Sequence, residues 1–216
     1  MAGLNWTLIW EGFLQTMEMV IISTVIAYVI GLPLGIVLSI TKKGGLAENR
    51  IVNTILGGIV NICRSIPFLI FLVVLIPLTR LIVGTSIGTE ATIVPLTFGA
   101  VPIIARMVEA SLEEVGSGIV EAARALGASK AQVVFLFILP EAVPSLLQGS
   151  AINCVTILGY SAMAGFIGGG GLGAIAYQYG FIRYQTDILL VTVVILIIIV
   201  WAVQELGLFA ARRSRH

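Results

Sequence analysis

The residues of this chain whose types could do chemistry are few and stand far apart. It has one histidine, His216 at the end of the sequence, and two cysteines, Cys63 and Cys154, in apolar stretches. Cysteine in such a stretch usually acts as a small apolar side chain, so no disulfide or metal site is expected. No His-Glu-x-x-His string and no pair of carboxylates occurs within an apolar stretch. Metal-dependent proteolysis and acid–base catalysis are therefore not expected, and His216 is given no role.

Two glycine patterns bear on nucleotide binding. Gly168-x-Gly170-x-x-Gly173 fits the dinucleotide fingerprint as a string, but no strand pattern precedes it. Loop glycines or close helix packing explain this string better. The phosphate-binding pattern Gly-x4-Gly-Lys-[Ser/Thr] does not occur in the sequence. We therefore expect no cofactor in this chain, and any ATP-dependent function would need a partner that binds and hydrolyses ATP.

Arg64 is the single residue that most calls for an explanation, because it interrupts an apolar stretch just before Pro67. An unpaired charge inside a membrane costs several kcal/mol, so such a residue calls for a partner or a function. A structural role would pair Arg64 with an acidic residue or with helix-end carbonyls. A functional role would place it along a path or at a gate. Both readings stay open, and Glu18 raises the same question more weakly.

The elements that must position these residues are membrane helices. The chain of 216 residues is 58% hydrophobic and 11% charged, whereas soluble domains carry about 25% charged residues. Long uncharged runs predict an all-α polytopic membrane protein with one transmembrane domain, 1–216, and five transmembrane helices. The net charge of +1 gives no reason to expect a nucleic-acid partner. The expected spans are residues 13–40, 51–77, 91–108, 140–165 and 188–209.

The distribution of lysine and arginine predicts the orientation in the membrane. The loops on one side hold Arg80 and Arg183, and the N-terminal tail on that side adds none. The loops on the other side hold nine basic residues, namely Lys42, Lys43, Arg50, Arg106, Arg124, Lys130, Arg212, Arg213 and Arg215. Because basic loops stay in the cytoplasm, the N-terminus is expected outside and the C-terminus inside.

A short polar segment, 121–127, lies between the third and fourth spans on the predicted cytoplasmic side. Residues 121–126 are good helix formers, and Gly127 suits the left-handed position just past a helix end. Ser129-x-x-Gln132 has the form of a capping box for a second helix, and Pro140 suits the first turn of the membrane helix that follows. The small side chains of the segment, Ala122, Ala123 and Ala125, would let another surface approach closely. The alternative is an ordinary amphipathic connector that rests on the lipid headgroups.

The pattern Glu121-Ala122-Ala123, Gly127 and Leu139-Pro140 resembles the EAA motif of ABC importer permeases. One departure is Phe137, which stands where that family usually has isoleucine. The resemblance implies that residues 116–135, with Arg124 among them, form a coupling segment that docks on an ATPase subunit.

A wider resemblance points to methionine-importer permeases of the type I fold. It is carried by the stretches 64–68, 77–88, 159–165 and 170–180, and it covers most of residues 12–210. It implies a bacterial inner-membrane complex with a second copy of the chain, an ATPase dimer that binds ATP and Mg²⁺, and an extracytoplasmic methionine-binding lipoprotein. The complex would carry methionine by alternating access, with no reaction catalysed in this chain.

By the same resemblance, Tyr160, Ser161 and Met163 would line the transport path, together with Arg64. From the residues alone, ordinary helix packing explains the first three as well. Met163 could seal a closed gate and still move aside, since its side chain is flexible. The alternatives are a permease for another amino acid or small solute and, from other classes, a membrane-embedded enzyme or a structural subunit.

Overall fold

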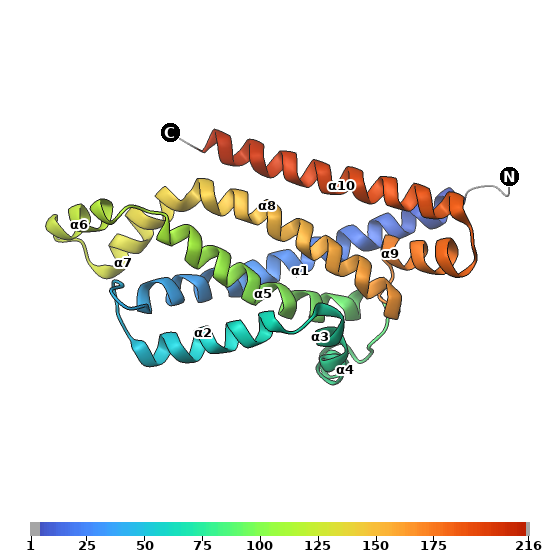
Figure 1. Ribbon diagram of the computed structural model, residues 1–216, viewed down its shortest axis with the longest axis horizontal. Coiled ribbons are helices and arrows are strands. Elements are labelled where there is room, and N and C mark those ends of the chain that lie inside the picture. The colour runs from blue at the N-terminus through green and yellow to red at the C-terminus, as the bar shows by residue number, and fades with distance from the viewer. Residues whose placement is uncertain (1–4, 215–216) are drawn as a thin grey trace. The chain divides into compact units, whose positions relative to one another are not determined.

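The computed structural model describes residues 5–214, so Arg215 and the unassigned His216 lie outside the described part. Its described residues contain helices and no strand, which confirms the all-α prediction (Figure 1). The α-helices are α1 (Trp6–Thr41), α2 (Arg50–Ser65), α3 (Phe68–Val74), α4 (Ile76–Val83), α5 (Thr89–Glu113), α6 (Ser117–Ala125), α7 (Lys130–Gln132), α8 (Leu139–Ala164), α9 (Gly171–Ile175) and α10 (Thr186–Arg213). Val133–Ile138 and Ala176–Ile182 are π-helical, and Gly165–Ile167 forms a 3₁₀ turn.

Among the described residues, four helical segments are long and apolar enough to cross a membrane: α1, α5, Lys130–Ile167 and α10. Helices α2 and α3 meet the same criterion only together, as one bent pair, which raises the number to five. The break lies at Ile66–Pro67, because proline lacks an N–H group and disfavours a helical residue before it. The membrane-spanning character of the fold therefore agrees with the sequence prediction.

The chain forms two compact units. Unit 1 contains Met1–Ala27, Ile66–Ala100 and Cys154–Gln204, and unit 2 contains Tyr28–Ser65, Val101–Asn153 and Glu205–His216. Each of the helices α1, α5, α8 and α10 contributes one part to each unit.

Unit 1 explains the glycine string. Side chains of α1 cap the start of α9: Gly171 N–H donates to Gln15 Oε1 at 2.8 Å and Leu172 N–H donates to Thr16 Oγ1 at 2.9 Å. A Cβ on Gly173 would collide with the backbone of Ala162. Gly173 therefore serves close packing, which is one of the two explanations that the sequence left open. The stretch after the glycines is not a loop, because α9 and a π-helical segment continue it to Ile182.

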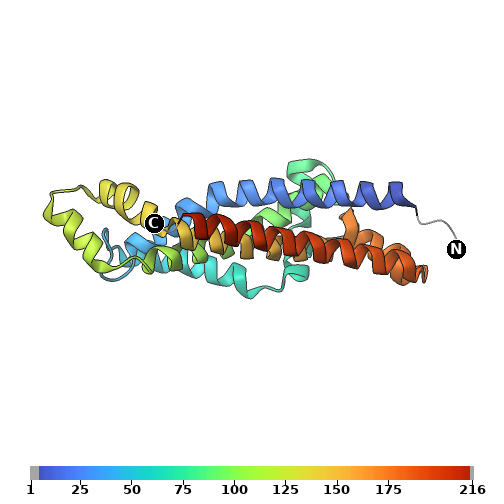
Figure 2. The same ribbon diagram turned by 90° about the horizontal axis from the view of Figure 1, so that it is seen from above.

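Unit 2 packs α1, α2 and α5 around a small apolar core. Leu38, Val60 and Ala105 are buried there, and two partly buried leucines, Leu34 and Leu56, pack against them. At one end of the unit, α6 and α7 extend beyond the adjoining ends of α5 and α8 (Figures 1 and 2). This end carries the segment that the sequence marks as polar.

The start of the fourth membrane helix differs from the prediction. The helix does not start near Pro140 but runs without interruption from Lys130 to Ile167. The π-helical turn makes this continuity possible, since Leu139 N–H bonds to Val134 O, five residues back. Pro140 is the second residue of α8. The N–H group that it lacks would lie where the backbone hydrogen bonds change from the π-helical to the α-helical pattern.

Arg106 also lies elsewhere than expected. The prediction of orientation counts it with the basic residues of a loop, but it lies inside α5, within the span expected at 91–108. Without Arg106, most of the basic residues still lie in loops on the same side of the membrane, so the predicted orientation does not change.

Candidate functional site

The turn after α6 has the geometry that the sequence predicts. Gly127 has φ +80° and stands just past the helix end. Gly127 N–H donates to Arg124 O at 2.9 Å, and Ala128 N–H donates to Ala123 O at 3.1 Å. These two bonds form a Schellman motif, which satisfies carbonyls that would otherwise have no partner at the helix end.

The next helix starts within two residues of that turn. Ser129 N–H donates to Gln132 Oε1 at 2.8 Å, and Gln132 N–H donates to Ser129 Oγ at 3.3 Å. This reciprocal pair is the predicted capping box. Because one helix is closed and the next is opened by local hydrogen bonds, residues 123–132 form a well-defined corner.

The two sides of α6 differ in exposure. Ala123 is fully buried, and the π-helical segment against which α6 packs includes the buried residues Val133 and Val134. The expectation that Ala123 presents a small side chain outward is therefore wrong, because α6 uses this residue for its own packing. Its outward side carries Glu121, Ala122, Arg124, Ala125 and Leu126, of which Leu126 is 80% exposed.

Glu121 and Arg124 do not brace each other across one helical turn. The ion pairs found within residues 5–214 are Lys42–Glu113 and Arg106–Glu109. Both of these exposed residues instead line a cavity of about 380 Å³ that α6 shares with the turn after α1. The charges of the α6 surface are thus available to a partner.

The Lys42–Glu113 pair fixes the neighbouring ends of α1 and α5. Lys42 Nζ donates to Glu113 Oε1 at 2.6 Å. Asn53 on α2 adds a second tie, since its Nδ2 donates to Leu38 O on α1 at 2.9 Å. The helices that meet near α6 are therefore held together by polar contacts as well as by the apolar core.

The remaining predicted site residues are distributed over both units. Within unit 1, the Tyr160 ring stacks on Phe68 with centroids 4.1 Å apart, and Met163 is 44% exposed. Ser161 is buried, and its hydroxyl donates to Leu158 O at 2.8 Å, the bond of a packed helical serine. Arg64 lies in the last turn of α2 in unit 2, where a cation suits the helix end. Leu139 and Pro140 open α8.

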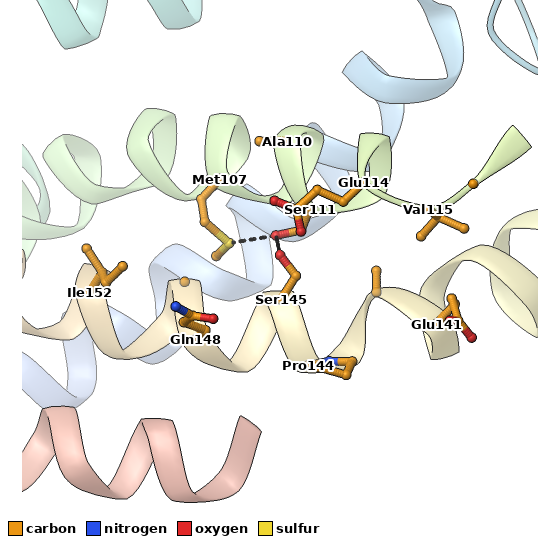
Figure 3. Close-up of a pocket in the computed structure, with 13 residues that line it drawn as sticks. Met107, Ala110, Ser111, Glu114, Val115, Glu141, Pro144, Ser145, Gln148 and Ile152 are labelled. Carbon is orange, nitrogen blue, oxygen red and sulfur yellow. Dashed lines mark hydrogen bonds between the residues drawn. The ribbon is translucent and has the colours of Figure 1, made fainter. Parts of the chain in front are cut away.

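Sequence reasoning missed a polar groove between α5 and α8. Figure 3 shows Met107 and Ser111 from α5 facing Ser145 and Gln148 from α8, with Glu114 in the turn just after α5. Ser145 Oγ donates to Ser111 Oγ at 3.0 Å, and Ser111 Oγ contacts Met107 Sδ at 3.6 Å. The groove encloses about 460 Å³. Its signal in the sequence is weak, because the paired serines are 34 residues apart.

A second cavity, of about 540 Å³, adjoins this groove. It shares Met107, Ala110, Gly149 and Ile152 with the groove and adds Arg64, Arg106 and Glu109. Arg106 is held firmly: its Nη1 donates to Glu109 Oε2, and its Nη2 donates to Gly57 O at 3.1 Å and to Asn61 Oδ1 at 2.9 Å.

Comparison with known proteins identifies the kind of molecule that carries these features. Residues 31–213 match the family described as binding-protein-dependent transport system inner membrane component. The probable D-methionine transport system permease protein MetI of Vibrio cholerae serotype O1 is 50% identical over 214 residues, 99% of this chain and 95% of the relative. The protein of the same name from Pasteurella multocida is 44% identical over 211 residues, 98% of this chain and 97% of the relative.

Solved structures agree with this match. A chain of the MetNI methionine ABC transporter in an inward-facing conformation aligns with a TM-score of 0.97 at 45% identity, over the whole of both chains. A chain of an amino acid ABC transporter, crystallised with histidines, aligns with a TM-score of 0.80 at 20% identity, which shows a common fold alone. Since the family match spans most of the sequence, this chain belongs to the family of binding-protein-dependent transport system inner membrane components.

Proposed function

We propose that this chain is the transmembrane subunit of an ATP-driven importer that carries methionine across the bacterial inner membrane. A member of this family is a transport subunit and not an enzyme. The observation that carries the cargo assignment is 50% identity, along nearly the whole chain, to a probable D-methionine permease. The methionine transporter aligned over the whole chain supports the same cargo.

The outward side of α6 is the proposed contact with the ATPase. It combines exposed charges, small side chains and the apolar Leu126 on a helix closed by local caps. A partner that pushes on α6 would move it as a rigid helix. The continuous helix from Lys130 to Ile167 would transmit that motion into the membrane. Glu121, Ala122, Arg124, Gly127, Leu139 and Pro140 belong to this coupling segment, and Ala123 supports it from within.

The working complex would contain two copies of this chain, two ATPase subunits that bind ATP and Mg²⁺, and an extracytoplasmic methionine-binding lipoprotein. The basic loops support a cytoplasmic α6 and an external N-terminus. ATP binding would favour one of two states of the paired permeases, through its different affinity for those states. Arg64, Tyr160 and Met163 remain candidates for the path, whereas the bond of Ser161 to its own helix favours packing.

One reconstitution experiment tests both the cargo and the coupling surface. The purified complex, supplied with its binding protein and ATP in liposomes, is expected to accumulate labelled methionine. Ala125→Trp, which places bulk on the exposed side of α6, should abolish co-purification of the ATPase and lower uptake at least to about a tenth of wild type. Thr85→Trp, an equally bulky change on the opposite side of the predicted membrane, should leave both unchanged.

The outcomes separate the two parts of the proposal. A wild-type complex that accumulates another amino acid but no methionine would contradict the cargo. An Ala125→Trp complex that keeps its ATPase and transports like wild type would contradict the docking surface. A permease for another amino acid is the remaining candidate of the same class, since the amino acid transporter with 20% identity shares the fold.

A further inference from the structure

The cavity of about 540 Å³ in unit 2 carries an unusual set of charges for a membrane helix bundle. Its lining includes two arginines, Arg64 and Arg106, and two glutamates, Glu109 and Glu113. The volume lies within the range of small-molecule sites, roughly 300–1,000 Å³. Charged groups inside a membrane protein are costly, so four of them around one cavity need an explanation.

Three of these charges have partners of opposite sign in the structure. Glu109 forms an ion pair with Arg106, and Lys42 forms an ion pair with Glu113. Arg64 differs from them, because within residues 5–214 no hydrogen bond or ion pair to its side chain is found. Arg64 is an exposed residue at the end of α2, and it lines a cavity large enough for a ligand. A free guanidinium in such a place is suited to bind a carboxylate, which it can meet with two parallel hydrogen bonds.

The rest of the cavity suits the other parts of an α-amino acid. Glu109 Oε2 accepts a hydrogen bond from Arg106, so Glu109 Oε1 is left to accept a hydrogen bond from an ammonium group. Ile103, Met107 and Ile152 supply an apolar wall, and the thioether of Met107 is soft and adaptable. The cavity therefore offers one cationic group, one anionic group and an apolar surface, which together match a zwitterion with an apolar side chain.

We propose that this cavity binds the α-amino acid cargo inside the permease, with Arg64 on the carboxylate, Glu109 on the ammonium group and Met107 beside the side chain. This inference rests on the proposed function and extends it, since it assigns a binding site to the permease itself. It also gives Arg64 a functional role in place of a structural pairing.

The test measures labelling at the cavity itself, and the dependence of protection on Arg64 distinguishes binding there from binding elsewhere in the complex. Ala110 is exposed and lines the cavity, and Ala110→Cys is placed in a chain in which Cys63→Ala and Cys154→Ala remove the native thiols. The complete complex, in lipid nanodiscs with its ATPase, is treated with a thiol reagent, and the rate of labelling at position 110 is measured with and without methionine.

We expect methionine to slow labelling, whereas methioninol, which lacks the carboxylate, and N-acetylmethionine, which lacks the ammonium group, should not. Arg64→Gln should raise the methionine concentration for half-protection about tenfold, and Arg64→Lys should restore most of the loss. Arg50→Gln, at the other end of the same helix, is the matched control and should leave protection unchanged.

Labelling that methionine does not slow in the otherwise unchanged complex would overturn the proposal, and so would equal protection by methioninol. Failure of the cargo assignment looks different. If another α-amino acid protects position 110 with the same dependence on Arg64, while methionine is neither bound nor taken up, the site stands and the methionine assignment fails.

Discussion

Arg106 shows how one partly buried cation can tie two membrane helices together. Its guanidinium bonds to Glu109 on its own helix and to Gly57 O and Asn61 on α2. The side chains of Arg106 and Glu109 are only 25% and 13% exposed, so water replaces lost partners poorly. The loss of one member of such a network leaves polar groups unpaired, which costs more than the pair itself contributes.

We therefore expect Arg106→Gln to lower the stability of the detergent-solubilised permease by about 2 kcal/mol. A thermal aggregation assay should show a clear drop in the midpoint temperature. Arg50→Gln removes an exposed arginine from the same helix pair and should leave the midpoint within error. Equal midpoints for the two variants would show that the Arg106 network contributes little.

At the scale of single residues, the sequence predicted local roles better than contacts across helices. Gly127 and the pair Ser129–Gln132 were predictable because their bonds lie within a few residues of one another. The burial of Ala123 and the bond between Ser111 and Ser145 depend on elements that meet only in the fold. Arg64 stood out from its cost in an apolar stretch, but its cavity could not be foreseen from spacing.

Among the elements, α6 shows the strongest dependence on backbone conformation. Its closing residue, Gly127, has φ +80°, which other L-residues reach only with strain. Gly118, by contrast, lies inside α6 with open space around the position of a Cβ. The two glycines of one short helix should thus respond to alanine in opposite ways.

Gly127→Ala is expected to destabilise the corner after α6 by about 1 kcal/mol, because alanine must adopt the left-handed conformation. Gly118→Ala should stabilise α6 by roughly 0.5–1 kcal/mol, because alanine loses less conformational entropy than glycine in a helix. Hydrogen exchange of the backbone amides of residues 117–128, followed by mass spectrometry, measures both effects. Faster exchange in both variants, or in neither, would contradict the assigned conformations.

The helical elements were predictable where hydrophobic runs are long, and less so where glycines cluster. The described α1, α5 and α10 each extend beyond the residues expected for their spans. Helix α9 was missed, because its glycine-rich start is typical of a loop. Its first N–H groups are satisfied by Gln15 and Thr16, which precede them by 156 residues, so no local pattern could reveal the helix.

For the whole molecule, the predicted topology is the feature on which the proposed mechanism depends. The turn after α1 and the α6 segment must both face the cytoplasm, and the α4–α5 connection must face outward. Lys43 and Thr85 are exposed representatives of the two sides.

In a background of Cys63→Ala and Cys154→Ala, Thr85→Cys should react with a membrane-impermeant thiol reagent in spheroplasts whose inner membrane is intact. Lys43→Cys should react only after the membrane is opened. The reverse pattern would contradict the orientation and, with it, the cytoplasmic docking surface.

The π-helical segment Val133–Ile138 has a consequence for how α8 is turned about its own axis. A π-helical hydrogen bond spans five residues, one more than an α-helical hydrogen bond. Each residue of an α-helix turns the chain by about 100° around the helix axis. The one extra residue therefore determines how far α8 is rotated about its own axis relative to α7. Ser145, Gln148 and Gly149 present their side of α8 to the groove only at this phase. The side of α8 that meets α5 is therefore fixed by chain length in a segment that does not touch the groove.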